Sequence, residues 1–353
     1  MGRVTRGGSL LGGRYRLVDR LGKGGMSVVW RGYDDVLGRP VAVKVLDRRL
    51  APDRMFRHRI RVEAQAAAQL CHPHITTVYD YGETVVDGAP VPYVVMELVN
   101  GVPLAARLAR DGVLPWREAV TVCVQVTSAL AAAHSRGVVH RDVTPGNVML
   151  THGGAKVVDF GISALAGEND VGPEGTLLGT PGYVAPERIN GGQVSPATDV
   201  YSVGLLLYRM LTGRLPWQVG SVTQMLRAHL HADPGPLPPV SGLPAEVAEL
   251  CRRCLAKDPL QRPSSADLAR RLADAVGMAV PMAVEQGGDD SSTAAKTVLP
   301  WVVTTDALPA PVRPRHSPAP RRIGPVVSIA VGLVAVTALL WLSAPLSDPL
   351  SGR

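Results

Sequence analysis

The stretch VVHRDVTPGNVML, residues 138–150, constrains this chain more than any other because it sets chemically active polar groups between two apolar flanks. Asp142 can accept a proton from a hydroxyl group, and Asn147 can offer its amide oxygen to a divalent cation. A second cation ligand is needed, and Asp159 in VVDFGIS supplies a carboxylate. Mg²⁺ is held by few carboxylates together with phosphate oxygens and water, so one aspartate and one asparagine suit it. The pattern therefore predicts a magnesium site beside a general base.

Two further segments predict a bound phosphate. The segment LGKGGMSVVW places Gly22, Gly24 and Gly25 between two expected strands, where glycine lets the backbone approach an anion and offer N–H groups. A tight hairpin would need glycine as well, so this loop alone is weak evidence. Lys44 lies in the apolar strand VAVKVL, where burying a cation without a partner would be costly. We expect Glu63, on the helical segment that follows, to pair with Lys44 and to hold its amine towards the phosphate.

The expected secondary structure falls into two halves. Apolar runs and alternation between glycine, aspartate and proline breaks predict strands, while apolar residues at helical spacing predict helices. The expected strands are Tyr15–Leu21, Val28–Gly32, Arg39–Leu46 and Tyr93–Leu98, and the expected helices are Met55–Leu70, Pro115–Ser135, Pro196–Leu211, Ala245–Leu255 and Ser264–Val276. A strand-rich first lobe before a helical second lobe predicts an α+β fold with a cleft between the lobes.

In their order and spacing, these segments resemble the eukaryotic-like protein serine/threonine kinases of bacteria, in their membrane-anchored branch. The resemblance covers residues 15–276. It includes GTPGYVAPE, whose Glu187 would form a structural ion pair with Arg262, and TDVYSVG, whose Asp199 is similar to the buried acid that binds the catalytic-loop backbone. The resemblance implies a bilobal protein-kinase fold with a small β-rich N-lobe and a larger helical C-lobe. It also implies an enzyme that phosphorylates serine and threonine in protein substrates.

The family's catalytic roles follow by resemblance. Lys44 would bind the α- and β-phosphates of ATP, and Glu63 would position Lys44. Asp142 would orient and deprotonate the substrate hydroxyl. Asn147 and Asp159 would hold the metal ions, Mg²⁺ or, in its place, Mn²⁺.

The resemblance also implies how ATP would be bound. Met96 is similar to the gatekeeper residue before the hinge MELVNG, and the backbone of Glu97 and Val99 would hydrogen-bond the adenine. The expected nucleotide-binding residues are Leu21, Gly22, Gly24, Gly25, Ser27, Val29, Lys44, Glu97 and Val99.

Thr144 departs from the family pattern. The family usually has lysine at this position, where it neutralises charge on the transferred phosphoryl group, and threonine brings no cation. Losing one such contact costs about 2–4 kcal/mol of transition-state stabilisation. We therefore predict a slow but active kinase. The alternative is a pseudokinase that binds ATP and acts as a scaffold.

Ser27, in place of the last loop glycine, is expected to be harmless. Thr176 is the expected phosphorylation site of the activation segment, with Arg141 as the receptor for its phosphate.

The end of the chain predicts a membrane anchor. Ile323–Leu342 runs without a charged residue for the length of a membrane-spanning helix and follows a segment rich in proline, alanine and arginine. A buried core helix is the alternative, but the preceding linker leaves no domain in which to bury it. Arginines precede this segment and would keep the kinase domain in the cytoplasm. We therefore predict a single-pass protein of the cell membrane, in contact with lipid. Small residues at Gly324, Ser328 and Gly332 could also pack two such helices into a homodimer.

These expectations divide the chain into five segments. They are an N-terminal extension (1–14), the kinase domain (15–276), a disordered juxtamembrane linker (277–322), a transmembrane helix (323–343) and a short external tail (344–353).

The net charge and the cysteines do not favour two other functions, nucleic-acid binding and zinc binding. The net charge is +7, but no dense basic run with interleaved aromatic residues is present, so nucleic acid is not an expected partner. Cys251 and Cys254 form a lone CxxC among leucines. A zinc site would need a second ligand pair, so we expect both thiols to pack in a helical core.

Overall fold

The computed structural model describes residues 9–25, 27–47, 53–86, 88–160 and 181–281. The chain divides into two compact units, Met1–Gly288 and Asp289–Arg353, and every described residue lies in the first. The predicted membrane helix, the external tail and most of the linker fall outside the described residues. Within the described ranges, no helix is long and apolar enough to cross a membrane.

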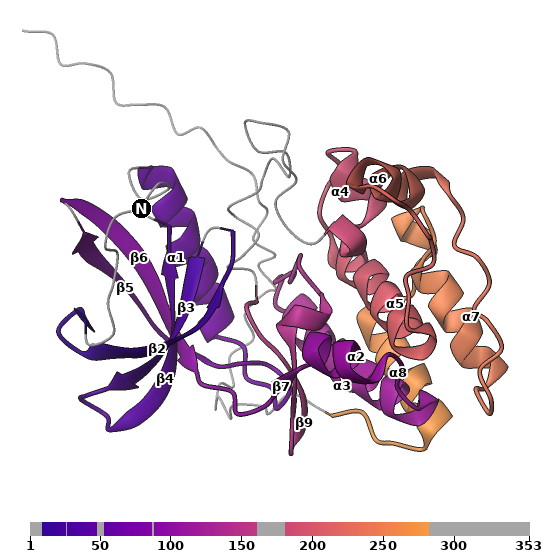
Figure 1. Ribbon diagram of the computed structural model, residues 1–353, viewed down its shortest axis with the longest axis horizontal. Helices are drawn as coiled ribbons and strands as arrows, with labels where there is room; N and C mark the ends of the chain where they lie inside the picture. Colours follow the sequence, from indigo (N-terminus) through magenta and orange to yellow (C-terminus); the bar gives the residue numbers. More distant parts are fainter. Residues whose placement is uncertain (1–8, 26, 48–52, 87, 161–180, 282–353) are drawn as a thin grey trace, which may run out of the picture. The chain divides into compact units, whose positions relative to one another are not determined.

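The first lobe is a six-stranded antiparallel sheet with one helix (Figure 1). The strand order is β1-β2-β3-β4-β6-β5. The strands are β1 (Leu10–Leu11), β2 (Tyr15–Lys23), β3 (Ser27–Asp34), β4 (Arg39–Leu46), β5 (Val78–Val86) and β6 (Ala89–Glu97). The four predicted strands lie within β2, β3, β4 and, but for its last residue, β6. Strand β5 was not predicted, because it is an edge strand without a fully buried residue. The sheet also begins before the predicted boundary at residue 15, since β1 pairs with β2.

Strand β4 is buried on both faces, which explains its continuous apolar run. Val41, Val43 and Val45 face one cluster of buried residues, while Ala42 and Leu46 face another against α1. Helix α1 (Arg54–Ala68) begins at Asp53, whose carboxylate accepts hydrogen bonds from two backbone N–H groups of the first turn. Lys44 is thus carried on a strand that is buried on both faces.

The second lobe is a bundle of helices around one large core (Figure 1). Its helices are α2 (Leu104–Asp111), α3 (Trp116–His134), α4 (Pro186–Ile189), α5 (Pro196–Thr212), α6 (Val222–His231), α7 (Ala245–Cys254) and α8 (Ser265–Val276). The long predicted helices correspond to α3, α5, α7 and α8. Helices α2 and α6 were not predicted, because each is short and buries only two residues.

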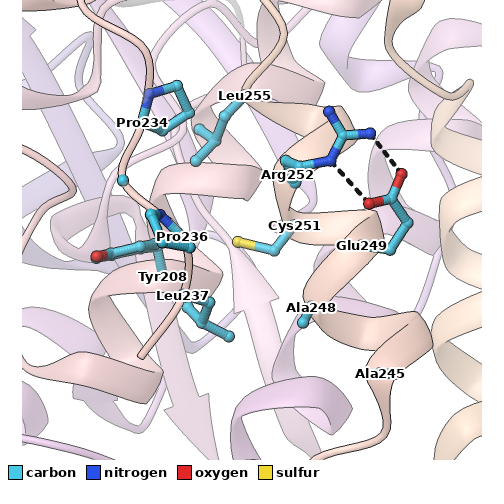
Figure 2. A pocket seen from close by; sticks show the side chains of 11 residues that line it. Tyr208, Pro234, Pro236, Leu237, Ala245, Ala248, Glu249, Cys251, Arg252 and Leu255 are labelled. Atoms are coloured by element: carbon cyan, nitrogen blue, oxygen red, sulfur yellow. Dashed lines mark hydrogen bonds and ion pairs between the residues drawn. The ribbon is translucent and has the colours of Figure 1, made fainter. Parts of the chain in front are cut away.

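Helix α7 packs closely on α5 at Gly204, where a Cβ atom would lie 2.7 Å from the Cβ of Cys254. Cys251 and Cys254 are both buried in this core, which confirms the packing role expected for the CxxC. Burial raises the pKa of the Cys251 thiol to about 12, so this thiol stays protonated at neutral pH. A cavity of about 270 Å³ lies between Cys251 and the chain at residues 234–237 (Figure 2). None of the predicted site residues lines it.

A small three-stranded sheet positions the central site residues. It consists of β7 (Val102–Pro103), β8 (Val148–Thr151) and β9 (Gly154–Val157). Val148 pairs with Val157, so the residues just outside this hairpin, Asn147 and Val158, meet at its open end. The backbone N–H of Val158 donates to the Asn147 carbonyl at 3.0 Å. The hairpin therefore brings Asn147 close to Asp159.

Candidate active site

Asp142 and Asn147 are in direct contact. The amide nitrogen of Asn147 donates to the Asp142 carboxylate at 2.8 Å and to the Asp142 carbonyl at 2.9 Å. Asn147 ends a short 3-10 helix, Pro145–Asn147, whose closing hydrogen bond runs from the Asn147 N–H to the Thr144 carbonyl at 3.0 Å. This turn folds the four intervening residues so that the predicted base and the predicted ligand converge.

Asp199 holds the backbone of the same loop. Its two carboxylate oxygens accept from the N–H groups of His140 and Arg141, each at 2.8 Å, and the His134 ring lies 2.8 Å from one of them. Arg141 has a φ of 68°, a left-handed conformation that is strained for a residue with a side chain. Asp199 is 1% exposed, so these charge-assisted hydrogen bonds fix the strained loop. The role predicted for Asp199 agrees with this geometry.

His140 ties the loop to the segment that carries Asp159. Its Nδ1 accepts from the Asp142 N–H at 3.2 Å, and its Nε2 lies 2.9 Å from the Val158 carbonyl, so the proton resides on Nε2. The ring packs edge-on against Phe160, with the centroids 4.7 Å apart. The sequence offered no signal for this bridge beyond the apolar flanks of His140.

Lys44 and Glu63 make ion pairs that differ from the predicted one. The Lys44 ammonium lies 3.2 Å from the Asp159 carboxylate, and the Arg141 guanidinium lies 3.1 Å from Glu63. Lys44 is 3% exposed, so the expectation that it needs an anionic partner was right. The partner differs because Asp159 approaches this buried amine from the second lobe, while the carboxylate of Glu63 on α1 meets Arg141.

The glycine-rich segment forms the hairpin between β2 and β3. The Gly24 N–H donates to the Ser27 carbonyl at 2.9 Å. A Cβ atom at Gly22 or Gly25 would meet no other atom within 4 Å, and neither residue has a positive φ. Since neither crowding nor backbone conformation within the chain requires glycine here, the open space suits the close approach of a ligand. Leu21 is exposed at the edge of this hairpin.

The other predicted nucleotide residues lie on the strands around Lys44. Val29 of β3 is opposite Lys44 in the sheet and packs against the cluster beside α1. Met96 is buried in the same cluster, as expected of a gatekeeper residue. Glu97 ends β6, and the half-buried Val99 follows it in the connection to the second lobe.

Glu187 and Arg262 form the predicted ion pair. Two guanidinium nitrogens donate to the two carboxylate oxygens at 2.7 and 2.9 Å, and the Thr198 hydroxyl adds a third hydrogen bond to Glu187 at 2.9 Å. Burial works against ionisation of Glu187, but the hydrogen bonds and charge of Arg262 outweigh it, so the pKa of Glu187 is lowered. The pair anchors α4 to the chain before α8.

The predictions made for Thr144 and Thr176 stay predictions. Thr144 is 5% exposed and begins the short 3-10 helix, so its side chain is largely buried. The predicted phosphorylation site Thr176 lies outside the described residues.

The residues present fit a nucleotide with its cation. The amide nitrogen of Asn147 is committed to Asp142, which leaves the amide oxygen for a cation. Asp159 adds a carboxylate at the same end of the β8–β9 hairpin. Lys44 adds an ammonium group that can bind phosphate oxygens. In the described part of the chain, no group of three or more His, Cys, Asp or Glu residues could hold a metal. With Asn147 and Asp159 as its protein ligands, Mg²⁺ would complete its shell with phosphate oxygens and water.

Comparisons with known proteins agree with this geometry. Residues 15–272 match the family model described as the protein kinase domain. The chain is 40% identical to the serine/threonine-protein kinase PksC of Streptomyces coelicolor, over 88% of this chain and 58% of PksC. It is 43% identical to PknA of Mycobacterium tuberculosis, over 73% of this chain and 60% of PknA. The chain thus matches less than two thirds of the length of these two relatives.

A solved structure shares the fold. The crystal structure of the PknI kinase domain of Mycobacterium tuberculosis superposes with a TM-score of 0.59 at 31% identity, over 78% of this chain and all of that domain. The bilobal architecture expected from the sequence is thereby confirmed.

Proposed function

The chain belongs to the bacterial eukaryotic-like protein serine/threonine kinase family, and from this membership we propose that it transfers the γ-phosphoryl group of ATP to serine and threonine hydroxyls of proteins. The observation that carries the proposal is the convergence of four side chains. Asp142 and Asn147 are hydrogen-bonded, Asn147 lies at the hairpin end beside Asp159, and Asp159 meets Lys44.

Each group has a part in the transfer. Lys44 binds phosphate oxygens, and the Gly22–Gly25 turn leaves room for them. Asn147 and Asp159 would hold Mg²⁺, which would neutralise negative charge on the phosphates. Asp142 orients the substrate hydroxyl and accepts its proton. The hydroxyl oxygen bonds to the γ-phosphorus while the bond to the β–γ bridging oxygen breaks, so ADP leaves and a phosphoprotein forms.

The test is phosphate transfer from labelled ATP with Mg²⁺. We expect the full chain to label itself, and Asp142→Asn to abolish labelling while Mg²⁺ and the non-hydrolysable nucleotide AMP-PNP still bind. Equal labelling of the two proteins would refute the proposal.

One observation favours a second function. Thr144 brings no cation to a place where phosphoryl transfer uses one, as in a pseudokinase that binds ATP and acts as a scaffold. That alternative predicts nucleotide binding without labelling by the unmodified chain.

The proposal extends to the membrane. It is supported by the uncharged run Ile323–Leu342 and by the arginines before it. Cell fractionation tests it: the full chain should pellet with membranes and resist alkaline extraction, and a chain lacking 323–353 should not. A full chain in the soluble fraction would contradict the proposal.

A further inference from the structure

Lys156, one of the few lysines of the chain, makes a contact that the proposed transfer reaction does not use. Its ammonium lies 2.6 and 2.8 Å from the two carboxylate oxygens of Glu97 and 3.4 Å from the Ile75 carbonyl oxygen. Both side chains are largely covered, with 22% and 27% of their area exposed. A lysine that meets three acceptors from two different segments is more constrained than a lone surface ion pair.

The two residues belong to different lobes. Glu97 is the last residue of β6, at the start of the connection between the lobes, and Lys156 lies in β9 of the second lobe. Strand β9 is itself bound to the chain between α1 and β5. The Val157 N–H donates to the His74 carbonyl at 2.8 Å, and the Thr76 N–H donates to the Val157 carbonyl at 3.0 Å. Strand β9, which carries Lys156, is therefore held on both edges, by β8 on one and by the chain at His74 and Thr76 on the other.

Glu97 is fixed by its backbone as well. Its N–H donates to the Thr77 carbonyl at 2.9 Å, and its carboxylate also lies 3.4 Å from the Thr77 N–H. By the resemblance to protein kinases, the backbone of Glu97 would hydrogen-bond the adenine at one end of ATP. Asp159, three positions after Lys156, meets the cation and phosphates at the other end. One strand thus fixes the positions of both ends of the nucleotide site.

We infer that Lys156 is a positioning residue for ATP, which sets the position of the hinge at Glu97 relative to the metal ligand Asp159. The inference rests on the proposed function. Without the ammonium group, the Glu97 carboxylate keeps only the long contact with Thr77, so the hinge is held to β9 less tightly, through backbone hydrogen bonds alone. Nucleotide affinity falls, because binding must then order the hinge. The chemical step depends on Asp142 and is affected less.

The test compares three variants of the full chain with the unmodified protein. Lys156→Met removes the charge and keeps an apolar stem, and Lys156→Arg restores a cation that can bind both carboxylate oxygens. Lys257→Met is the matched control, because Lys257 also bridges two acceptors, the carbonyls of Ala228 and His229, but it follows α7 and contacts α6, within the second lobe. The readouts are the Kd of Mg²⁺–AMP-PNP by calorimetry, the KM for ATP, kcat, and Tm.

We expect Lys156→Met to raise the Kd and the KM for ATP about tenfold, because the variant loses one charge-assisted hydrogen bond. Its kcat should stay within about twofold of the unmodified value. Lys156→Arg should restore both constants, and Lys257→Met should lower Tm without changing the Kd. A Kd for Lys156→Met within twofold of the unmodified value overturns the inference, even if its Tm falls. If the unmodified chain binds no nucleotide, the proposed function fails and the inference fails with it.

Discussion

Replacing Arg262 with alanine should severely destabilise the second lobe. The side chain is completely buried, and it donates to the two carboxylate oxygens of Glu187 and to the carbonyls of Ala256, Ala197 and Lys257. Its removal leaves a buried carboxylate without its cation and three carbonyls without their donor. Breaking a buried pair in this way costs about 3–5 kcal/mol of the free energy of unfolding.

The matched control is Arg252→Ala. Arg252 also pairs with a glutamate through two short hydrogen bonds, to Glu249 (Figure 2). That pair is open to solvent, with side-chain exposures of 68% and 47%. Exposed pairs contribute about 0–1 kcal/mol, so the two variants separate the effect of burial from the effect of pairing.

The assay is urea unfolding followed by far-ultraviolet circular dichroism, with the slope m checked for each variant. The reasoning is refuted if Arg262→Ala loses less than about 1 kcal/mol, or no more than Arg252→Ala, with m unchanged.

The same pair gives a pH dependence. The pKa of Glu187 is lowered from its ordinary value of 4.5 in the folded protein, so its ionisation stabilises the fold. This contribution is present above the unfolded-state pKa and is lost as the pH falls through the folded-state pKa. The stability difference between the native chain and Glu187→Gln should therefore narrow on acidification below pH 4.5; a difference that widens there would contradict the assigned direction.

Three further changes test other contacts. Thr144→Lys should raise the autophosphorylation rate, by up to the 10²–10³ that one electrostatic contact is worth; an unchanged rate would mean that another group compensates. Asp199→Asn should lower kcat about a hundredfold by releasing the strained loop, with little change in nucleotide Kd; wild-type kcat would show that the loop holds its shape unaided. Gly204→Ala should cost about 1–3 kcal/mol in thermal unfolding, because its methyl group meets Cys254; an unchanged Tm would show that α7 can shift.

The elements that the sequence predicted are those with a strong apolar pattern. Helices α3 and α5 are long and bury residues on most of their surface, and β4 is a short, mostly apolar run, so length and apolar content identify them. Strand β5 and helix α6 were missed because they lie at edges of their lobes and bury little.

The site residues were predicted by motif, but their ion pairs were not. Lys44, Glu63, Arg141 and Asp159 are two cations and two anions, and sequence spacing permits more than one pairing among them. The position of α1 relative to the second lobe decides which pairing forms, and no local pattern encodes it. Lys156 was missed for a related reason, since its partner Glu97 lies on another strand and no motif links the two.

The contact of Glu63 with Arg141 and the contact of Lys44 with Asp159 each join the two lobes. In both pairs one partner comes from the first lobe and the other from the second lobe. The charged groups around the proposed nucleotide site therefore also connect the two lobes to each other.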